Sequence, residues 1–247
     1  MGQIGLFYNS VLFELEQSFG QVKRQQEDLS QALTEKETLI DSILPKRIAQ
    51  RMTAGEEQIV DQIADATVVF VDIVDFTAYS ASVPPAESMA LLEDLFGRYD
   101  EVIRAYDLEK IKTIGDSYMF VAGVTRAQAD HCAAAVDAAL ELLFVTNQLA
   151  QKLGRDLTVR IGVHSGPLVA GLIGDLRFVY DLWGTTVNVA ARIEEAGKPG
   201  KVSVSEAVLT RLADEFSYQR QGRVRLKGIG PTLLYSIEGR QATLKRA

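Results

Sequence analysis

The chain has 247 residues, of which 47% are apolar and 24% are charged, a balance typical of a globular protein rather than a disordered one. Its net charge of −7 and the lack of a long basic run argue against a nucleic acid as partner. The one cysteine, Cys132, permits neither an intramolecular disulfide nor a cysteine metal cluster, which fits a reducing cytosol.

The chain begins with an apolar segment, Ile4–Phe13, that is too short to span a membrane and is interrupted by Asn9. The segment has neither a basic flank nor a cleavage site, so we do not interpret it as a signal peptide. We expect the natural chain to extend further upstream.

Residues 1–44 are predicted to form one long helix. From Leu15 onward, mostly apolar residues recur at alternating intervals of four and three, which is the period of a coiled coil. This seam consists of Leu15, Phe19, Val22, Gln26, Leu29, Leu33, Lys36, Ile40 and Ile43. An amphipathic helix packed on its own domain is the alternative. So narrow a stripe favours a parallel dimeric coiled coil.

Residues 45–65 are predicted to be a hinge. The Leu44-Pro45 step ends the long helix, because the residue before a proline is pushed out of the α region. A short second helix over 46–52 is stopped by Gly55, and Glu56–Asp65 is a largely polar connection.

A globular domain is predicted over residues 66–240, with a tail over 241–247. It opens with the buried strand 67–71. The elements that follow are a helix over 86–106, two strands joined by a Gly115-Asp116 turn, a helix over 127–153, strands over 157–164 and 168–173, an arm over 178–183, a helix over 187–195, and strands near 202–204, 218–219, 224–226 and 233–237. This order predicts an α+β fold, a ferredoxin-like βαββαβ sandwich with a C-terminal β-rich extension.

Acidic residues stand at the ends of two predicted core strands. Asp72 follows the first strand, and Asp116 lies in the turn of a hairpin whose first strand carries Lys112. Because the core strands of such a sandwich lie side by side, the two carboxylates would form an oxygen-rich site suited to Mg²⁺. Two divalent ions can activate a hydroxyl and neutralise a phosphate during an in-line displacement. Ordinary turn acids are the alternative.

The segment Ile73–Thr77 is predicted to turn sharply and open a short helix. Free backbone amides at such a turn can hold phosphate oxygens without a basic side chain, although Thr77 is equally plausible as a plain helix cap. Other polar residues in apolar settings are Arg160, Asp181, Asn188, Arg192 and Lys227. Each of these also has a structural explanation as a surface charge, a helix pair or a turn residue.

Five segments, in the right order, resemble the catalytic domain of class III nucleotidyl cyclases, the adenylyl and guanylyl cyclases. They are Phe70–Thr77, Glu109–Met119, Arg160–Gly166, Tyr180–Arg192 and Leu226–Gly230, within a resemblance that runs from about Thr67 to Glu238. The resemblance implies attack of a ribose 3′ oxygen on the α-phosphorus of a nucleoside triphosphate, with release of pyrophosphate.

The resemblance also assigns roles to the candidate residues. Asp72 and Asp116 would hold two Mg²⁺ or Mn²⁺ ions. The triphosphate would be bound by Arg160, by Lys227 and by the backbone amides of Ile73, Val74, Asp75, Phe76 and Thr77. Asn188 would orient the ribose, and Arg192 would stabilise charge in the transition state.

Lys112 and Asp181 would read the purine base. A lysine donates to N1 of adenine and an aspartate accepts from its N6 amine, whereas guanine presents the opposite pattern. The guanylyl branch typically carries Glu and Cys at these positions, so the pair points to ATP and to an adenylyl cyclase that forms 3′,5′-cyclic AMP. The alternatives are a guanylyl cyclase, a catalytically silent nucleotide-binding regulatory module, and a purely structural dimerisation domain.

In this family the active sites lie at a dimer interface. One subunit would supply Asp72, Asp116 and Arg160, and the other Lys112, Asp181, Asn188, Arg192 and Lys227. The chain contains both sets, so the resemblance implies a homodimer with shared sites. Residues 1–65 are then a transducer that links the cytoplasmic catalytic pair to an upstream sensor, either a membrane domain that anchors the parent protein or a soluble one. A change of coil register or rotation would carry the signal.

The sequence departs from the family pattern in two places. Asp75 replaces a common glycine and puts an extra carboxylate beside the predicted phosphate site, where it would either weaken anion binding or add a metal contact. Ile229 replaces a second lysine, with little effect expected if Lys227 makes the contact.

Overall fold

The structure is a computed structural model that describes residues 2–124, 129–174, 176, 178–212 and 215–241. By its internal contacts the chain divides into two compact units, Met1–Glu57 and Gln58–Ala247. Residue 127, where the third long helix was predicted to begin, lies outside the described residues, as does nearly all of the predicted tail.

The first unit consists of two helices, α1 (Gly2–Ile43) and α2 (Lys46–Thr53), with Pro45 at the junction, as the sequence predicted. Six apolar residues of the predicted seam are between 47% and 72% exposed: Leu15, Phe19, Val22, Leu29, Leu33 and Ile43. The stripe of apolar side chains along α1 is therefore open to solvent, and a dimeric coiled coil remains a prediction.

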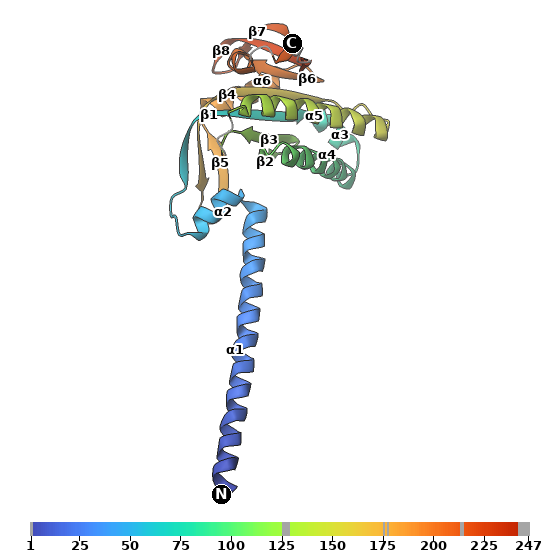
Figure 1. Ribbon diagram of the computed structural model, residues 1–247. Coiled ribbons are helices and arrows are strands. Elements are labelled where there is room, and N and C mark those ends of the chain that lie inside the picture. Colours follow the sequence, from blue (N-terminus) through green and yellow to red (C-terminus); the bar gives the residue numbers. More distant parts are fainter. Residues whose placement is uncertain (1, 125–128, 175, 177, 213–214, 242–247) are drawn as a thin grey trace, which may run out of the picture. The chain divides into compact units, whose positions relative to one another are not determined.

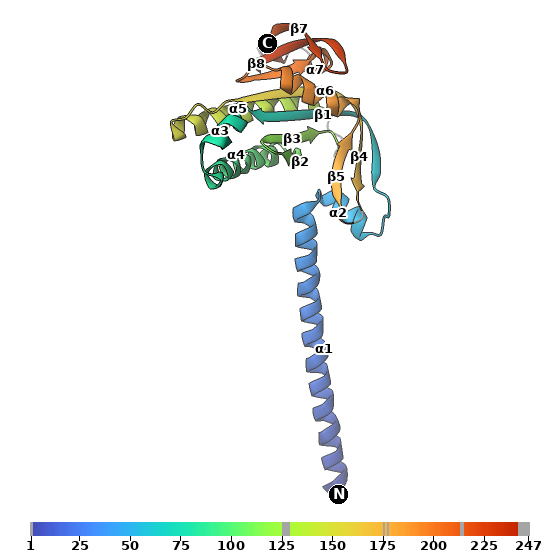
Figure 2. The ribbon, with the colours of Figure 1, turned by 180° about the vertical axis from the view of Figure 1, so that it is seen from behind.

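The second unit is built on one eight-stranded sheet. Its strands are β1 (Val60–Ile73), β2 (Glu109–Ile114), β3 (Ser117–Ala122), β4 (Val159–Ile173), β5 (Val179–Trp183), β6 (Lys201–Ser205), β7 (Phe216–Leu226) and β8 (Gly230–Arg240). Their order is β2-β3-β1-β4-β6-β8-β7, with β5 paired to β4. The β2–β3 hairpin therefore lies near one end of the sheet and the C-terminal strands lie at the other (Figure 1, Figure 2).

Five helices accompany the sheet: α3 (Phe76–Ser82), α4 (Pro85–Ala105), α5 (His131–Leu153), α6 (Thr185–Ala196) and α7 (Glu206–Leu212). Helices α4 and α5 cover one face, where Val69 and Val71 of β1 join Leu95 and Leu142 in the main core. Helix α5 is apolar and long enough to cross a membrane by composition alone, but its residues form this core. Because side chains alternate along a strand, the even-numbered residues near the end of β1 face the opposite side, which α6 partly covers.

Four details differ from the sequence-based prediction. Strand β1 begins at Val60, within the predicted connection, and β4 runs without a break through residues 165–167, where a turn was expected. The two strands pair from Val60 opposite Gly171 to Ile73 opposite Val159, and this long pairing extends both. Gly166 does not form the expected turn. Its lack of a side chain lets α6 approach β4, since a Cβ there would lie 2.8 Å from the Thr186 hydroxyl. Strand β7 is continuous, and α7 was not predicted.

Candidate active site

The ends of β1 and β4 bring an aspartate and an arginine together on the face opposite α4 and α5. Asp72 and Arg160 are direct partners in the antiparallel register of these strands. The Arg160 guanidinium donates to the Asp72 carboxylate over 3.0 Å, and both side chains are partly buried. Neighbouring strands thus fix the first two predicted site residues side by side, although they are 88 residues apart in sequence.

The second carboxylate comes from the β2–β3 hairpin. Gly115 adopts a φ of 63° at its turn, and Ser117, which follows Asp116, is paired with Asp72. Burial, and next the negative charge of Asp116, raise the pKa of the Asp72 carboxyl above its ordinary value, while Arg160 opposes this. The structure therefore brings Asp72 and Asp116 within electrostatic range of each other, as predicted from the strand ends.

Two neighbouring carboxylates, one of them with a raised pKa, fit a divalent cation, because the cation would offset their mutual repulsion. Among the described residues there is no group of three or more His, Cys, Asp or Glu side chains placed to bind a metal. Water and substrate phosphates would therefore complete the coordination shell, which is how proteins commonly bind Mg²⁺.

Glu194 is a third acidic residue at this site, and the sequence analysis missed it. The residue is 6% exposed, and its carboxylate accepts a hydrogen bond from Arg160 Nε over 3.1 Å. Burial, and then the charge of Asp72, raise the pKa of Glu194 from an ordinary 4.5 to about 7. The sequence did contain one signal, since Glu194 is two positions after the candidate residue Arg192 in the same helix.

The turn after β1 opens α3, and its amides are not all free. The Val74 amide donates to the Thr158 carbonyl over 2.9 Å, so in this structure it is not open to a phosphate. Asp75, not Thr77, is the N-cap residue of α3, and it has a left-handed backbone conformation with φ 56°. The bond to Thr158 removes the Val74 amide from the predicted phosphate cradle and leaves the amides of Ile73, Asp75, Phe76 and Thr77 as candidates.

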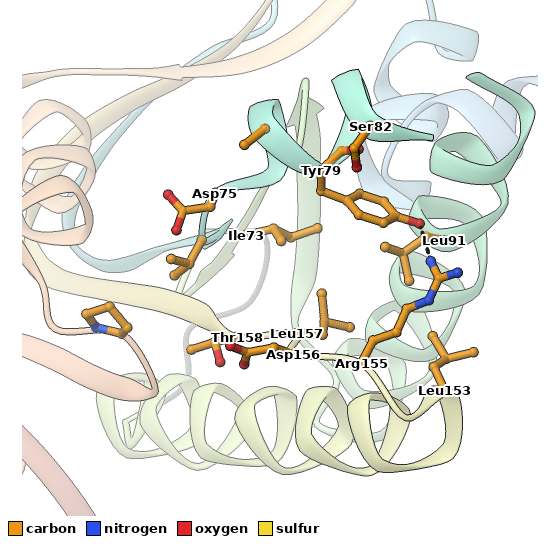
Figure 3. Close-up of a pocket in the computed structure, with 13 residues that line it drawn as sticks. Ile73, Asp75, Tyr79, Ser82, Leu91, Leu153, Arg155, Asp156, Leu157 and Thr158 are labelled. Atoms are coloured by element: carbon orange, nitrogen blue, oxygen red, sulfur yellow. Dashed lines mark hydrogen bonds between the residues drawn. The ribbon is translucent and has the colours of Figure 1, made fainter. Parts of the chain in front are cut away.

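A cavity of about 480 Å³ lies beside the same turn (Figure 3). Its wall includes Asp75, Tyr79 and Leu91, and the Arg155 side chain closes one side. The Arg155 guanidinium donates to the Tyr79 hydroxyl over 2.7 Å and to Glu87 over 2.5 Å, so its charge is already balanced. Neither Asp72 nor Asp116 lines this cavity.

Lys112 and Asp181 form a second cluster. Strand β2 carries Lys112 and β5 carries Asp181, and their side chains make an ion pair of 2.5 Å. The other Asp181 oxygen accepts from the Leu182 amide over 2.9 Å. The structure therefore brings together, within one chain, the two residues that were predicted to read a base.

The remaining predicted site residues are Asn188, Arg192 and Lys227. Asn188 is exposed on α6, Arg192 is paired with Glu195 of the same helix, and Lys227 is exposed in the β7–β8 turn next to Gly228, whose φ is 77°. In the part of the chain that the structure describes, no hydrogen bond or ion pair joins these three residues to Asp72, Asp116 or Arg160. One chain therefore presents the predicted residues in separate groups.

Comparison with known proteins agrees with this fold. Residues 59–239 match the adenylate and guanylate cyclase catalytic domain, and the chain belongs to this family. It is thus a class III nucleotidyl cyclase domain, as the sequence motifs indicated, and an enzyme of this class.

Characterised relatives include both kinds of cyclase. An adenylate cyclase of Mycobacterium tuberculosis is 40% identical over 206 residues, which cover 83% of this chain and 46% of that protein. The receptor-type guanylate cyclase Gyc76C of Drosophila melanogaster is 36% identical over 209 residues, or 82% of this chain and 14% of that protein. The chain therefore spans less than half the length of these relatives.

Solved structures of guanylyl cyclase domains are similar in fold to this chain. The guanylate cyclase domain of RhGC from Catenaria anguillulae in complex with GTP has a TM-score of 0.70 and 32% identity, over 73% of this chain and 100% of that one. The catalytic core of a rhodopsin-guanylyl cyclase with converted specificity, in complex with ATPαS, has a TM-score of 0.70 and 33% identity, over 73% and 98%. These likenesses confirm the predicted α+β fold.

Proposed function

We propose that this domain is an adenylyl cyclase that converts ATP to 3′,5′-cyclic AMP and pyrophosphate. The observation that carries the proposal is the ion pair between Lys112 and Asp181. Its ammonium is a donor for adenine N1, and its carboxylate is an acceptor for the N6 amine. Guanine would place a donor against the lysine and an acceptor against the aspartate, and each buried polar group left unpaired costs about 1–3 kcal/mol.

In the proposed reaction, the ribose 3′ oxygen forms a bond to the α-phosphorus while the bond from that phosphorus to the bridging oxygen of the β-phosphate breaks. The 3′ hydroxyl proton passes to solvent, and pyrophosphate leaves. Arg160 and Lys227 hold the polyphosphate, Asn188 orients the ribose, and Arg192 offsets the negative charge that develops in the transition state. Two divalent cations held by Asp72 and Asp116 would supply charge neutralisation and lower the pKa of the attacking hydroxyl.

The proposed active form is a homodimer. Within the described residues, Asn188, Arg192 and Lys227 make no hydrogen bond or ion pair with Asp72, Asp116 or Arg160. A second copy of the chain is therefore the natural source of the missing half of each site. The exposed apolar stripe of α1 supports pairing of two chains through a coiled coil. We further propose that residues 1–65 transmit a signal from an upstream domain to a catalytic pair in the cytoplasm.

The test is a direct assay of the purified chain with ATP or GTP, in the presence of Mg²⁺ or Mn²⁺, in which both cyclic products are quantified. The proposal predicts cyclic AMP as the main product and a larger kcat/KM for ATP than for GTP. Nucleotide binding without either product would instead indicate a regulatory module. Neither binding nor turnover would indicate a structural domain.

A guanylyl cyclase is the second candidate. The Drosophila receptor-type guanylate cyclase is 36% identical to this chain, and the GTP-bound fungal guanylate cyclase domain is 32% identical. The same assay separates the two candidates. A preference for GTP would refute the role given to Lys112 and Asp181.

A further inference from the structure

Glu194 stands out among the acidic residues of the second unit. It is 6% exposed, lies on α6, and its carboxylate accepts a hydrogen bond from Arg160 Nε. The roles proposed above do not use it. A buried carboxyl group is costly unless it makes a hydrogen bond, and the hydrogen-bond donor to Glu194 is Arg160.

The position of Glu194 is set by backbone packing. A Cβ at Gly162 of β4 would lie only 2.2 Å from the Glu194 amide nitrogen, so α6 lies directly on the strand at this glycine. Gly162 and Arg160 are two residues apart and therefore face the same side of β4. The close approach of α6 thus places the Glu194 carboxylate over the Arg160 side chain, with little freedom to move away.

Two acceptors hold the Arg160 guanidinium in one orientation. Nε donates to Glu194 over 3.1 Å, and one terminal nitrogen donates to Asp72 over 3.0 Å. A guanidinium has five N–H donors in a fixed plane, so three remain for another ligand. Two of these remaining N–H groups belong to Nη1, and the third belongs to Nη2, the nitrogen that also donates to Asp72.

We propose that Glu194 is a positioning residue for Arg160, and that it turns the free guanidinium donors toward the polyphosphate of the bound nucleotide. The inference rests on the proposed function in one respect, namely that Arg160 binds the polyphosphate. Glu194 acts through the hydrogen bond it accepts, and its negative charge is incidental to this role. If Glu194 acts by positioning Arg160, loss of its acceptor should weaken polyphosphate binding. If its negative charge were what mattered, loss of that charge should strengthen polyphosphate binding.

The variants are Glu194→Gln, which keeps an acceptor oxygen, and Glu194→Met, which fills a similar volume with no acceptor. A buried carboxylate replaced by an apolar side chain of similar size often leaves a protein folded. Glu93→Gln, at an exposed position on α4, is the matched control. Each protein is titrated with inorganic tripolyphosphate in the presence of Mg²⁺ by calorimetry, which needs no turnover, and KM and kcat for ATP are measured in parallel.

We expect Glu194→Met to weaken tripolyphosphate binding at least tenfold and to raise KM more than it lowers kcat, while Glu194→Gln and the control stay within about threefold of the parent protein. In an Arg160→Lys background, which lacks the Nε donor, Glu194→Met should have no further effect.

Unchanged or tighter binding by Glu194→Met would overturn the proposal, as would an equal loss in both backgrounds. If that variant does not fold, tighter binding by Glu194→Gln overturns it instead, since a charge effect would then dominate. Failure of the parent protein to bind tripolyphosphate or form either cyclic nucleotide would instead count against the proposed function.

Discussion

The Lys112 ammonium lies 2.5 Å from a carboxylate oxygen of Asp181, an ion pair that joins β2 to β5 across 69 residues of sequence. The second Asp181 oxygen accepts from the Leu182 amide, so the carboxylate is fixed in orientation. The two groups thus satisfy each other before a base arrives. When an adenine binds, part of this contact would be replaced by hydrogen bonds from Lys112 to adenine N1 and from the N6 amine to Asp181.

Reversal of the hydrogen-bonding pattern should change the preferred nucleotide. The double variant Lys112→Glu and Asp181→Cys replaces the donor by an acceptor and removes the charged acceptor. We expect kcat/KM for ATP to fall by at least tenfold and that for GTP to rise, because each unpaired buried group costs about 1–3 kcal/mol. Steady-state rates with both nucleotides measure the effect. An unchanged ratio would mean that these residues do not contact the base.

Neutralisation of either carboxylate at the proposed metal site should abolish turnover without harming the fold. We expect Asp72→Asn and Asp116→Asn to lower kcat at least 100-fold with Mg²⁺, since an in-line displacement depends on the cations they hold. In metal-free buffer, Asp116→Asn should melt no lower than the parent protein, because the Asp116 charge raises the pKa of Asp72 and so opposes its ionisation. Asp94→Asn, at an exposed position on α4, is the control. Substantial activity in either site variant would contradict the assignment.

Asp75 combines a left-handed backbone, with φ 56° and ψ 24°, and a negative charge beside the predicted phosphate cradle. Asp75→Gly should be more stable than Asp75→Ala by about 1 kcal/mol, because only glycine adopts this conformation without a β-carbon penalty. Both variants lose the charge, so both should bind tripolyphosphate more tightly than the parent protein. Denaturant unfolding and calorimetry separate the two effects. Weaker binding by both variants would instead indicate that Asp75 contributes a metal contact.

His164 should make the protein acid-sensitive. Burial, and next the positive charge of Arg211, lower the pKa of His164 from 6.5 to about 4, and its Nδ1 lies 2.7 Å from the Ser205 hydroxyl. Because the pKa is lower in the folded state, the unfolded chain binds the proton first. The free energy of unfolding should therefore fall as the pH drops from 6.5 toward 4.

His164→Gln should make this decline shallower, which denaturant titrations at pH 7, 6 and 5 can measure. Glu194 acts in the opposite sense, since its pKa is raised to about 7 and its stabilising contribution is lost as the pH rises from 4.5 through 7. Glu194 is present in both proteins, so it cancels in the difference. Parallel pH curves for the two proteins would refute the role of His164.

The exposed stripe of α1 should mediate dimer formation. Leu29 is 61% exposed and lies in the predicted seam, whereas Gln25 lies outside it. We expect Leu29→Lys to weaken dimerisation by at least tenfold and Gln25→Lys to leave it unchanged, because a buried, unpaired lysine in the seam is costly. Sedimentation equilibrium measures both. Equal behaviour of the two variants would refute the coiled coil.

The sequence predicted the local parts of this fold well and its long-range contacts less well. The β2–β3 hairpin, with Asp116 at its turn, followed from β-branched residues flanking Gly115, and the length of α1 followed from its seam. The local sequence did not predict that β4 continues through Pro167, because this depends on two long-range contacts. These are the pairing of β4 with β1 and the approach of Thr186 to Gly166. Glu194 was missed for the same reason, since its role depends on backbone contact with Gly162.

The candidate site is assembled from strands that are distant in sequence. Asp72 and Arg160 are 88 residues apart, and Lys112 and Asp181 are 69 residues apart. Contacts of this range form late in folding, because the entropy of closing long loops must be met before they give any stabilisation. The backbone hydrogen bonds of helix α1, by contrast, join residues four apart in sequence, so this helix can form early. Recovery of nucleotide binding during refolding should therefore follow the slowest sheet-forming phase, well after most helical signal has returned.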